Sequence, residues 1–219
     1  MSPSAVRGQF NELLERLISA SLSVKQFWPS ERTGGEGELV IGSIAGTSIA
    51  LRDIAYEDVY KELDSTEAYH AKLVDGGLLQ LQYTFRGTVL SKQRLAYFPS
   101  PILPTIEDVP ELYEEDELYG DILSRQLVRF PVRFDYAPDD RVDVLHPAAH
   151  LTLGQYASCR IPVVGPLGPM TFGMFIVRNF YFRAYRKHKN NFDRKPSAID
   201  PVETISANER LLSHFVPGR

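Results

Sequence analysis

The chain has 219 residues, of which 43% are hydrophobic and 24% are charged, and its formal net charge at pH 7 is −4. These values are typical of one globular domain, and the negative charge excludes a protein that holds nucleic acid by bulk charge alone, so such a contact needs a local basic patch. The single cysteine, Cys159, excludes an internal disulfide and a zinc site built from several cysteines.

No stretch of the sequence has the length of a signal-peptide core or a membrane span. The first ten residues, MSPSAVRGQF, contain no apolar core, and the longest apolar run, 170–177, is far shorter than the roughly 20 residues that a span needs. We therefore expect a soluble, cytoplasmic protein with no membrane partner. We expect one domain over 1–219, with a helical N-terminal segment over 1–30 and a C-terminal tail with a short helix over 191–219.

The first predicted element is an amphipathic helix over residues 4–22. Apolar side chains recur there at three- and four-residue spacing from Val6 to Ile18, and Ser4 is a suitable N-cap. Two short strands, near 39–42 and 48–51, and a short helix over 53–63 are predicted next.

The clearest pattern predicts an antiparallel meander over residues 68–98. Its first strand ends at Asp75-Gly76, a residue pair that favours a type I′ turn. Its second strand alternates strictly and so buries one face, which carries Leu79, Leu81, Tyr83 and Phe85. Arg86-Gly87 then turns the chain into a third strand over 89–98.

A proline-rich connection over 99–110 leads to a predicted helix over 111–128. Eight carboxylates and no basic side chain occur between Glu107 and Asp121. Such a charge run indicates a solvated acidic face. The alternative is a contact surface for a basic partner.

The sheet is predicted to continue over residues 130–163. The strand 130–136 alternates between an apolar face and a polar face that carries Arg133 and Asp135. Further strand segments are predicted over 141–145 and 150–153, with a kink at Pro147. These patterns predict an α+β fold, in which an antiparallel sheet of six or more strands packs one face against the helices 4–22, 111–128 and 169–190.

The longest predicted helix begins at Pro169 and ends near Asn190. Its second half is basic and aromatic, which favours contact with an RNA or DNA backbone through Arg178, Arg183, Arg186 and Lys187. The alternative is a helix whose far end is solvated or docked on the acidic segment. Ser206 and Glu209 form a capping box that predicts a last short helix ending at Phe215.

Six blocks in this order are distinctive in combination: DGGLLQLQYTF, QRLAYFPSP, PVRFDYAP, HPAAHLTLG, CRIPV and FIVRNFY. They resemble a bacterial family known as domain of unknown function 2290, over about residues 68–182. That resemblance implies no activity, fold or cofactor. A second and looser likeness covers about 20 residues, because the order Arg-x-Asp-Tyr, His-Pro and then a second His is similar to small bacterial toxins of the RNase type.

His146 and His150 are the candidate catalytic residues. Two imidazoles can divide the cleavage of RNA, since one takes the proton of the 2′-hydroxyl and the other protonates the leaving oxygen, and both titrate near neutral pH. Arg133 or Arg160 would hold the phosphate. We expect the two histidine side chains within about 8 Å of each other on one side of the sheet, beside one of these arginines.

Other interpretations of the same residues stay open. The histidines can instead satisfy backbone carbonyls at strand ends, and Arg133 can form a structural ion pair with Asp135 or across the sheet. A zinc site would add Cys159, Asp139 or Asp143 to the two histidines. Arg183 and His188 also match the Arg-x4-His spacing of helical RNases of the HEPN type.

Two function classes follow from these observations. The first is a metal-independent ribonuclease of the toxin or phage-defence kind, which uses His146 and His150 with Arg160 or Arg133 and needs no cofactor. The second is a non-catalytic binding or adaptor subunit that docks nucleic acid or a nuclease or ATPase partner encoded nearby. The ribonuclease requires both imidazoles and an arginine to open onto one cleft, whereas a binding module does not.

Overall fold

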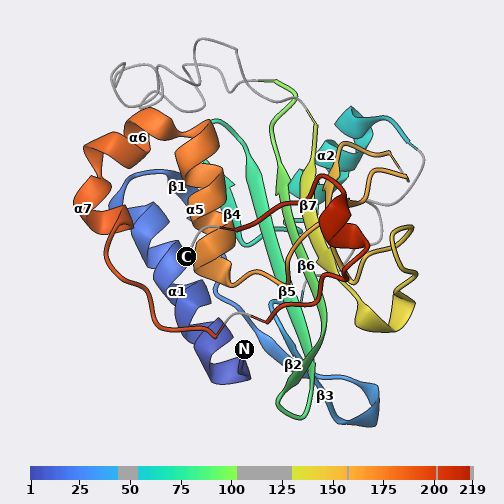
Figure 1. The fold of residues 1–219 in the computed structure, drawn as a ribbon. Helices are drawn as coiled ribbons and strands as arrows, with labels where there is room; N and C mark the ends of the chain where they lie inside the picture. Colours follow the sequence, from blue (N-terminus) through green and yellow to red (C-terminus); the bar gives the residue numbers. More distant parts are fainter. Residues whose placement is uncertain (44–53, 103–129, 157, 201, 218–219) are drawn as a thin grey trace.

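The computed structural model describes residues 1–43, 54–102, 130–156, 158–200 and 202–217 (Figure 1). The strands in these ranges form one antiparallel sheet of nine, which confirms the α+β class. The sheet order is β1-β4-β5-β6-β7-β8-β9. Strand β4 pairs with the start of β5, and β3 pairs with the end of β5, at residues 83–86. Strand β2 pairs with β3. The strands are β1 Ser23–Gln26, β2 Glu31–Thr33, β3 Glu38–Ile41, β4 Ala71–Leu73, β5 Leu78–Arg86, β6 Val89–Phe98, β7 Val132–Tyr136, β8 Ala149–Leu153 and β9 Ile161–Pro162.

The predicted meander is the centre of the sheet. Strand β5 pairs with β6 along its whole length, with Leu79 opposite Tyr97 and Leu81 opposite Leu95. The four side chains that were predicted to share the buried face all belong to the main core. The alternation of apolar residues therefore identified the core face of β5 correctly, because side chains on a strand point to opposite faces in turn.

The turn between β4 and β5 differs from the predicted type I′ turn. The N–H of Gly76 donates to the carbonyl of Leu73 at 2.8 Å, so the central residues are Val74 and Asp75. Only Gly76 of this turn has a positive φ, +85°. The Asp75 carboxylate accepts from the N–H of Gly77 at 2.9 Å and points into the protein, which fixes Asp75 outside the left-handed region that a type I′ turn requires.

Helices α1, Pro3–Ser19, and α5, Pro169–Phe180, cover the core face of the sheet side by side, as expected (Figure 1). The cap of α1 is Ser2 and not the predicted Ser4, because the Ser2 hydroxyl accepts from the N–H of Ala5 and Pro3 occupies the first turn. The predicted helical segment 1–30 is also too long, since residues 23–26 join the sheet as β1.

The predicted helix 169–190 is divided into α5, α6 Phe182–Lys187 and α7 Lys189–Phe192. The first break lies at Tyr181, whose φ and ψ are −132° and 47°. The Tyr181 hydroxyl donates to the buried Asp75 carboxylate at 2.9 Å and lies 3.0 Å from the Tyr97 hydroxyl. A buried carboxylate needs hydrogen-bond donors, and the Tyr181 hydroxyl at the helix break is one donor to Asp75. Burial raises the pKa of Asp75.

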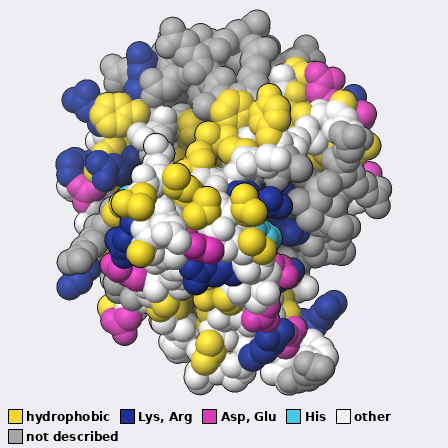
Figure 2. Space-filling model, turned by 45° about the vertical axis from the view of Figure 1, so that its right-hand side comes forward, with side chains coloured by type: hydrophobic (Ala, Val, Ile, Leu, Met, Phe, Trp, Pro, Cys, Tyr) yellow, Lys and Arg dark blue, Asp and Glu magenta, His cyan; other side chains and the backbone are white. Residues whose placement is uncertain are grey.

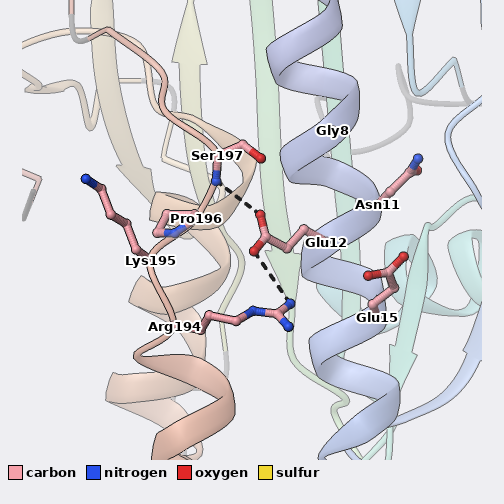
Figure 3. Close-up of a pocket in the computed structure, with 8 residues that line it drawn as sticks. All are labelled: Gly8, Asn11, Glu12, Glu15, Arg194, Lys195, Pro196 and Ser197. Carbon is pink, nitrogen blue, oxygen red and sulfur yellow. Dashed lines mark hydrogen bonds and ion pairs between the residues drawn. The ribbon is translucent and has the colours of Figure 1, made fainter.

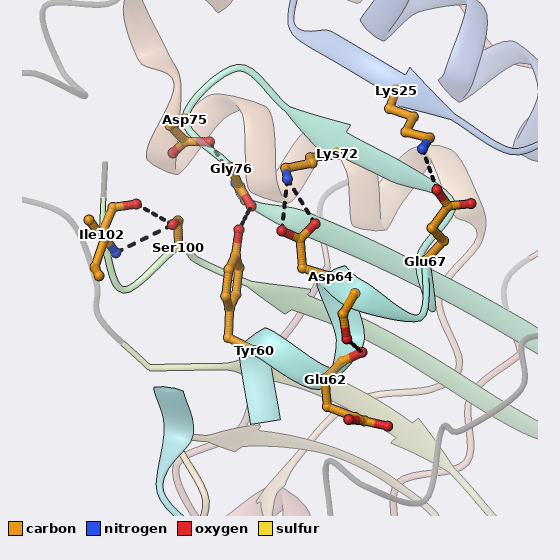
Figure 4. Close-up of polar contacts among 12 residues, drawn as sticks. Lys25, Tyr60, Glu62, Asp64, Glu67, Lys72, Asp75, Gly76, Ser100 and Ile102 are labelled. Carbon is orange, nitrogen blue, oxygen red and sulfur yellow. Dashed lines mark hydrogen bonds and ion pairs between the residues drawn. The ribbon is translucent and has the colours of Figure 1, made fainter. Parts of the chain in front are cut away.

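Helix α2, Tyr56–Ser65, covers the opposite face of the sheet with a smaller core. Its Leu63 packs with Leu78 and Phe98 there. The Tyr60 hydroxyl donates to the carbonyl of Gly76 at 2.6 Å, and Lys72 pairs with an α2 carboxylate, that of Asp64 (Figure 4). A helix was predicted over residues 53–63, but its packing against this face of the sheet was not predicted.

The predicted strand 141–145 is absent, because only Val142 and His146 form an isolated antiparallel bridge there. The Ser206–Glu209 capping box is confirmed by hydrogen bonds of 2.8 and 3.1 Å. It opens a single 3₁₀ turn, η4 Glu209–Leu211, in place of a helix to Phe215. Phe215 instead packs on Phe134 and bridges to Val163, which holds the chain extended.

Three predicted elements fall in ranges that the structure does not describe. They are the strand 48–51, most of the proline-rich connection 99–110 and the acidic helix 111–128. None of the helices among the described residues combines the length and the apolar character of a membrane span.

Candidate functional site

Strands β7 and β8 bring the polar side chains of the site onto one face of the sheet. The apolar side chains of β7 belong to the main core, so Arg133 and Asp135 project from the other face. Because β7 pairs with β8 in antiparallel register, Asp135 lies opposite His150, and Arg133 lies opposite Thr152. The polar alternation read from the sequence is therefore confirmed.

A tight loop places His146 beside His150. Val142 and His146 exchange two backbone hydrogen bonds, of 3.0 and 2.7 Å, which close the loop. The two imidazole centroids lie 5.1 Å apart and the ring planes differ by 55°. The expectation that both histidines lie close together on one side of the sheet is confirmed.

Both histidines line one pocket of about 300 Å³ together with Arg133 and Arg160, as expected for the cleft. On the face turned forward in Figure 2, histidine atoms reach the surface between basic side chains. The pocket lining contains four Lys or Arg side chains against two carboxylates: Lys92, Arg94, Arg133 and Arg160 against Asp135 and Asp140. The pocket is therefore suited to an anion.

Arg133 is the most informative side chain in the pocket. It is 7% exposed, and its Nε and Nη1 have no hydrogen-bond partner among the described residues. Asp135, its expected ion-pair partner, instead pairs across the sheet with Arg94 at 3.3 Å. Burial lowers the pKa of Arg133. A buried cation without a partner destabilises a fold, and an anion in the pocket would remove that cost.

His150 is held as a neutral base. Its Nδ1 lies 3.0 Å from the carbonyl oxygen of Pro147, which can only accept, so Nδ1 carries the proton and Nε2 holds a lone pair. Burial is the main cause that lowers the pKa of His150, although the hydrogen bond to Pro147 and the nearby Asp135 carboxylate act in the opposite direction. The hydrogen bond to Pro147 agrees with the structural interpretation of His150, but it also fixes the tautomer that a general base needs.

A model of the family described as "Uncharacterized conserved protein (DUF2290)" matches residues 22–216. The chain belongs to this family. The match includes every residue that lines the histidine pocket. No curated protein matches the chain, and no solved structure matches it either.

The third ligands proposed for a zinc site are engaged elsewhere. Asp139 pairs with Arg86 at 2.8 Å, and Asp143 accepts from Ser206 at 2.6 Å. The Cys159 sulfur accepts from a backbone N–H of β8 at 3.4 Å. Within the described ranges, no three His, Cys, Asp or Glu side chains come together as metal ligands. The described residues therefore do not form the alternative zinc site.

The basic side chains predicted for nucleic-acid contact are exposed, and none of them lines the histidine pocket. Arg178 lies in the last turn of α5 and over the ring of Tyr185 at 5.3 Å, while the other three belong to α6. Their contact with nucleic acid stays a prediction. The Arg183 and His188 pair belongs to a protein with a nine-stranded sheet among its described residues, which is not the all-helical architecture of HEPN RNases.

A second hollow lies between α1 and the C-terminal segment (Figure 3). Its central carboxylate, that of Glu12, lies 3.6 Å from the guanidinium of Arg194 and accepts from the N–H of Ser197 at 3.3 Å. Glu12 also accepts from Arg16 at 2.6 Å. Since this carboxylate is already engaged, we assign no chemistry to the hollow.

Two basic residues of the pocket were missed in the sequence, Lys92 and Arg94 of β6. They stand two residues apart on the same strand, so they share a face. Strand β6 pairs with β7 so that Arg94 lies opposite Asp135. The signal that could have identified Arg94 is an arginine and an aspartate that each lie on the polar face of a predicted strand, because opposite charges on neighbouring strands tend to pair.

Proposed function

We propose that this protein is a metal-independent ribonuclease of the bacterial toxin or phage-defence kind. The observation that carries the proposal is the pocket in which two imidazoles, 5.1 Å apart between centroids, lie with the buried guanidinium of Arg133, whose Nε and Nη1 have no hydrogen-bond partner among the described residues. Paired imidazoles supply a base and an acid without a metal, and an unpaired cation supplies the binding of an anion.

His150 acts as the general base in this proposal. Its Nε2 takes the proton of a ribose 2′-hydroxyl, and the oxygen forms a bond to the adjacent phosphorus. The phosphorus–oxygen bond to the 5′-oxygen of the next nucleotide breaks, and the Nε2–H or Nδ1–H of protonated His146 gives that oxygen a proton. The products are a 2′,3′-cyclic phosphate and a free 5′-hydroxyl. Arg133 and Arg160 neutralise the charge that develops on the phosphoryl oxygens.

The proximity of the rings favours opposite protonation states. Two imidazolium ions at this separation repel each other, so the first proton makes the second harder to add. His150 is the buried member and has the lowered pKa, whereas His146 is half-buried. We therefore assign the role of base to His150, the more buried ring, and the role of acid to His146.

Cleavage of RNA by the purified protein tests the proposal. We expect cleavage that persists in EDTA and leaves 2′,3′-cyclic phosphate ends. His150→Ala and His146→Ala are each expected to lose about 10²–10⁴ in rate. His214→Ala is the matched control, because Nδ1 of His214 also lies near a backbone carbonyl, that of Leu212 at 2.9 Å, outside the pocket.

Three results would count against the proposal. Cleavage that EDTA abolishes would indicate a bound metal, and cleavage that survives in both histidine variants would move the active site elsewhere. If the wild-type protein does not cleave RNA, the proposed ribonuclease activity is wrong. In cells, expression without a cognate inhibitor should slow growth, and His150→Ala should relieve that effect.

The second candidate function is that of a non-catalytic adaptor, which docks a nuclease or ATPase partner. The loop that carries His146 favours it, because Val142, Val144 and Leu145 are all exposed there and Leu145 is 73% exposed. Adjacent exposed aliphatic side chains are typical of protein contacts. Leu145→Asp should then abolish binding to a partner encoded nearby and leave any RNA cleavage unchanged, whereas His150→Ala should leave partner binding unchanged.

A further inference from the structure

An exposed aromatic ring lies at the rim of the histidine pocket. Tyr156 is 76% exposed and lines the pocket, and its hydroxyl has no hydrogen-bond partner among the described residues. It is more exposed than Trp28, Phe182 and Phe130, the other exposed aromatic side chains in the described ranges. The exposed ring of Tyr156 contributes little to the stability of the fold, so we consider a role in binding for it.

The ring of Tyr156 is supported from beneath by Gly154. This glycine has φ +73°, and a Cβ atom on it would lie 3.3 Å from both Cδ2 and Cε2 of the ring. The absence of a side chain at Gly154 therefore lets the ring rest against the backbone. The side-chain amide of Gln155 donates to the carbonyl of Ile54 at 3.0 Å and ties this turn to a distant segment. The turn that carries Tyr156 is thus anchored on both sides of the ring, by Gly154 and by Gln155, and a ring that is ordered before binding would lose less entropy on binding.

The platform lies next to groups that bind phosphate. Arg133 and Arg160 line the same pocket, and neither has an ion-pair partner among the described residues. An unpaired base stacks on an exposed aromatic ring whatever its sequence, while cations track the phosphates beside it. Bases in a duplex have no free face except at its ends.

We infer that Tyr156 stacks on an unpaired base next to the phosphate held by Arg133 and Arg160, so that the substrate is single-stranded RNA. The inference rests on the proposed function, since it takes the anion in the pocket to be an RNA phosphate. A volume of about 300 Å³ is at the lower end of ligand sites. It suits one nucleotide of a chain that continues outside the pocket, and it is too small to enclose a base pair.

Binding of a fluorescein-labelled single-stranded RNA with 2′-O-methyl riboses tests the inference. This probe lacks the 2′-hydroxyl and cannot be cleaved, so binding is measured by anisotropy independently of catalysis. Tyr156→Ala should weaken binding about 5- to 100-fold, the range that corresponds to loss of one stacked base. Tyr156→Phe should bind as the wild type does, because the hydroxyl is not used. Trp28→Ala, which removes an exposed ring outside the pocket, is the control.

The same RNA annealed to its complement should bind more weakly and should not respond to Tyr156→Ala. Unchanged binding of the single strand by Tyr156→Ala would overturn the inference, as would equal binding of the duplex or no binding of either probe. Adenosine monophosphate that binds as tightly as the RNA, with the same dependence on Tyr156, would reassign the site to a free nucleotide. If binding depends on Tyr156 but unmodified RNA is not cleaved, the proposed ribonuclease activity is wrong and the stacking on Tyr156 stands. If RNA is cleaved but Tyr156→Ala binds the probe as the wild type does, the stacking on Tyr156 is wrong and the ribonuclease activity stands.

Discussion

The Glu209 carboxylate accepts the backbone N–H of Val144 at 3.4 Å and thereby joins the C-terminal segment to the loop that carries His146. Glu209 is buried, and its other oxygen accepts from the N–H of Ser206. Val144 has φ +67°, a conformation that a β-branched residue rarely adopts. Contacts from the C-terminal segment thus hold the His146 loop in a strained conformation, which is common near functional sites.

Glu209→Ala should lower both stability and the rate of RNA cleavage. The change removes the capping box and the support of Val144, and loss of such a cap and its hydrogen bonds costs about 1–3 kcal/mol. Urea denaturation measures the first effect and single-turnover cleavage the second. Arg210→Ala is the control, because that arginine makes only a surface ion pair with Glu203. A denaturation midpoint equal to that of the wild type would show that Glu209 does not support the loop.

Val144→Gly should stabilise the protein by about 1 kcal/mol, because glycine adopts the left-handed conformation without the clash that a side chain meets there. The same change at Val142, whose φ is not positive, should destabilise it. Both are measured by thermal unfolding. An equal loss of stability in the two variants would mean that position 144 carries no strain.

Arg133→Met should increase the free energy of unfolding by about 1–4 kcal/mol while it weakens phosphate binding. The arginine is buried, and two of its nitrogens have no hydrogen-bond partner among the described residues, so an apolar side chain of similar volume removes a desolvation cost. Arg94→Met should have the opposite effect on stability, because it leaves the Asp135 carboxylate without its partner. Chemical denaturation compares the two. Destabilisation by Arg133→Met as large as that by Arg94→Met would indicate that Arg133 serves the fold.

Acid should destabilise the protein through His70. Burial lowers the pKa of this histidine from 6.5 to about 3, and its Nδ1 accepts the N–H of Leu81 at 3.2 Å. Below pH 6.5 the unfolded chain takes up a proton that the folded protein does not, so stability falls as the pH falls. The free energy of unfolding should decrease by about 1.4 kcal/mol per pH unit down to about pH 3.

His70→Leu should remove this contribution and flatten the dependence of stability on pH below 6.5. His214→Leu, at a more exposed site, should leave the slope as it is. Urea denaturation at a series of pH values measures the slopes. A His70→Leu slope equal to that of the wild type would mean that His70 is protonated in the folded protein.

Arg183→Glu combined with Arg186→Glu should weaken nucleic-acid binding and reduce its dependence on salt. Each phosphate contact that is lost should lower the log–log salt slope by about one unit or slightly less. Arg32→Glu with Lys61→Glu changes the charge equally at two exposed positions outside α6 and serves as the control. Equal effects of the two double variants would show that α6 acts only through net charge.

Features that depend on neighbours along the chain could be predicted from the sequence. Strict alternation identified the core faces of β5 and β7, and the same periodicity placed Arg133 and Asp135 on the polar face. The spacing of His146 and His150 located the candidate site, and Ser206 with Glu209 marked a cap. These patterns are reliable because strand period and cap geometry are local properties of the backbone.

Which groups meet across the chain depends on the tertiary structure. The long predicted helix breaks at Tyr181, whose hydroxyl donates to Asp75, 106 residues away in the sequence. Asp135 pairs with Arg94 because β6 is the neighbour of β7 in the sheet, and Arg133 then has no ion-pair partner in the part of the chain that the structure describes. Local patterns set the face on which a side chain lies, but strand order and register set its partner. The environment of Arg133 that marks the candidate site therefore depends on the pairing of Asp135 with Arg94, which the sequence pattern does not determine.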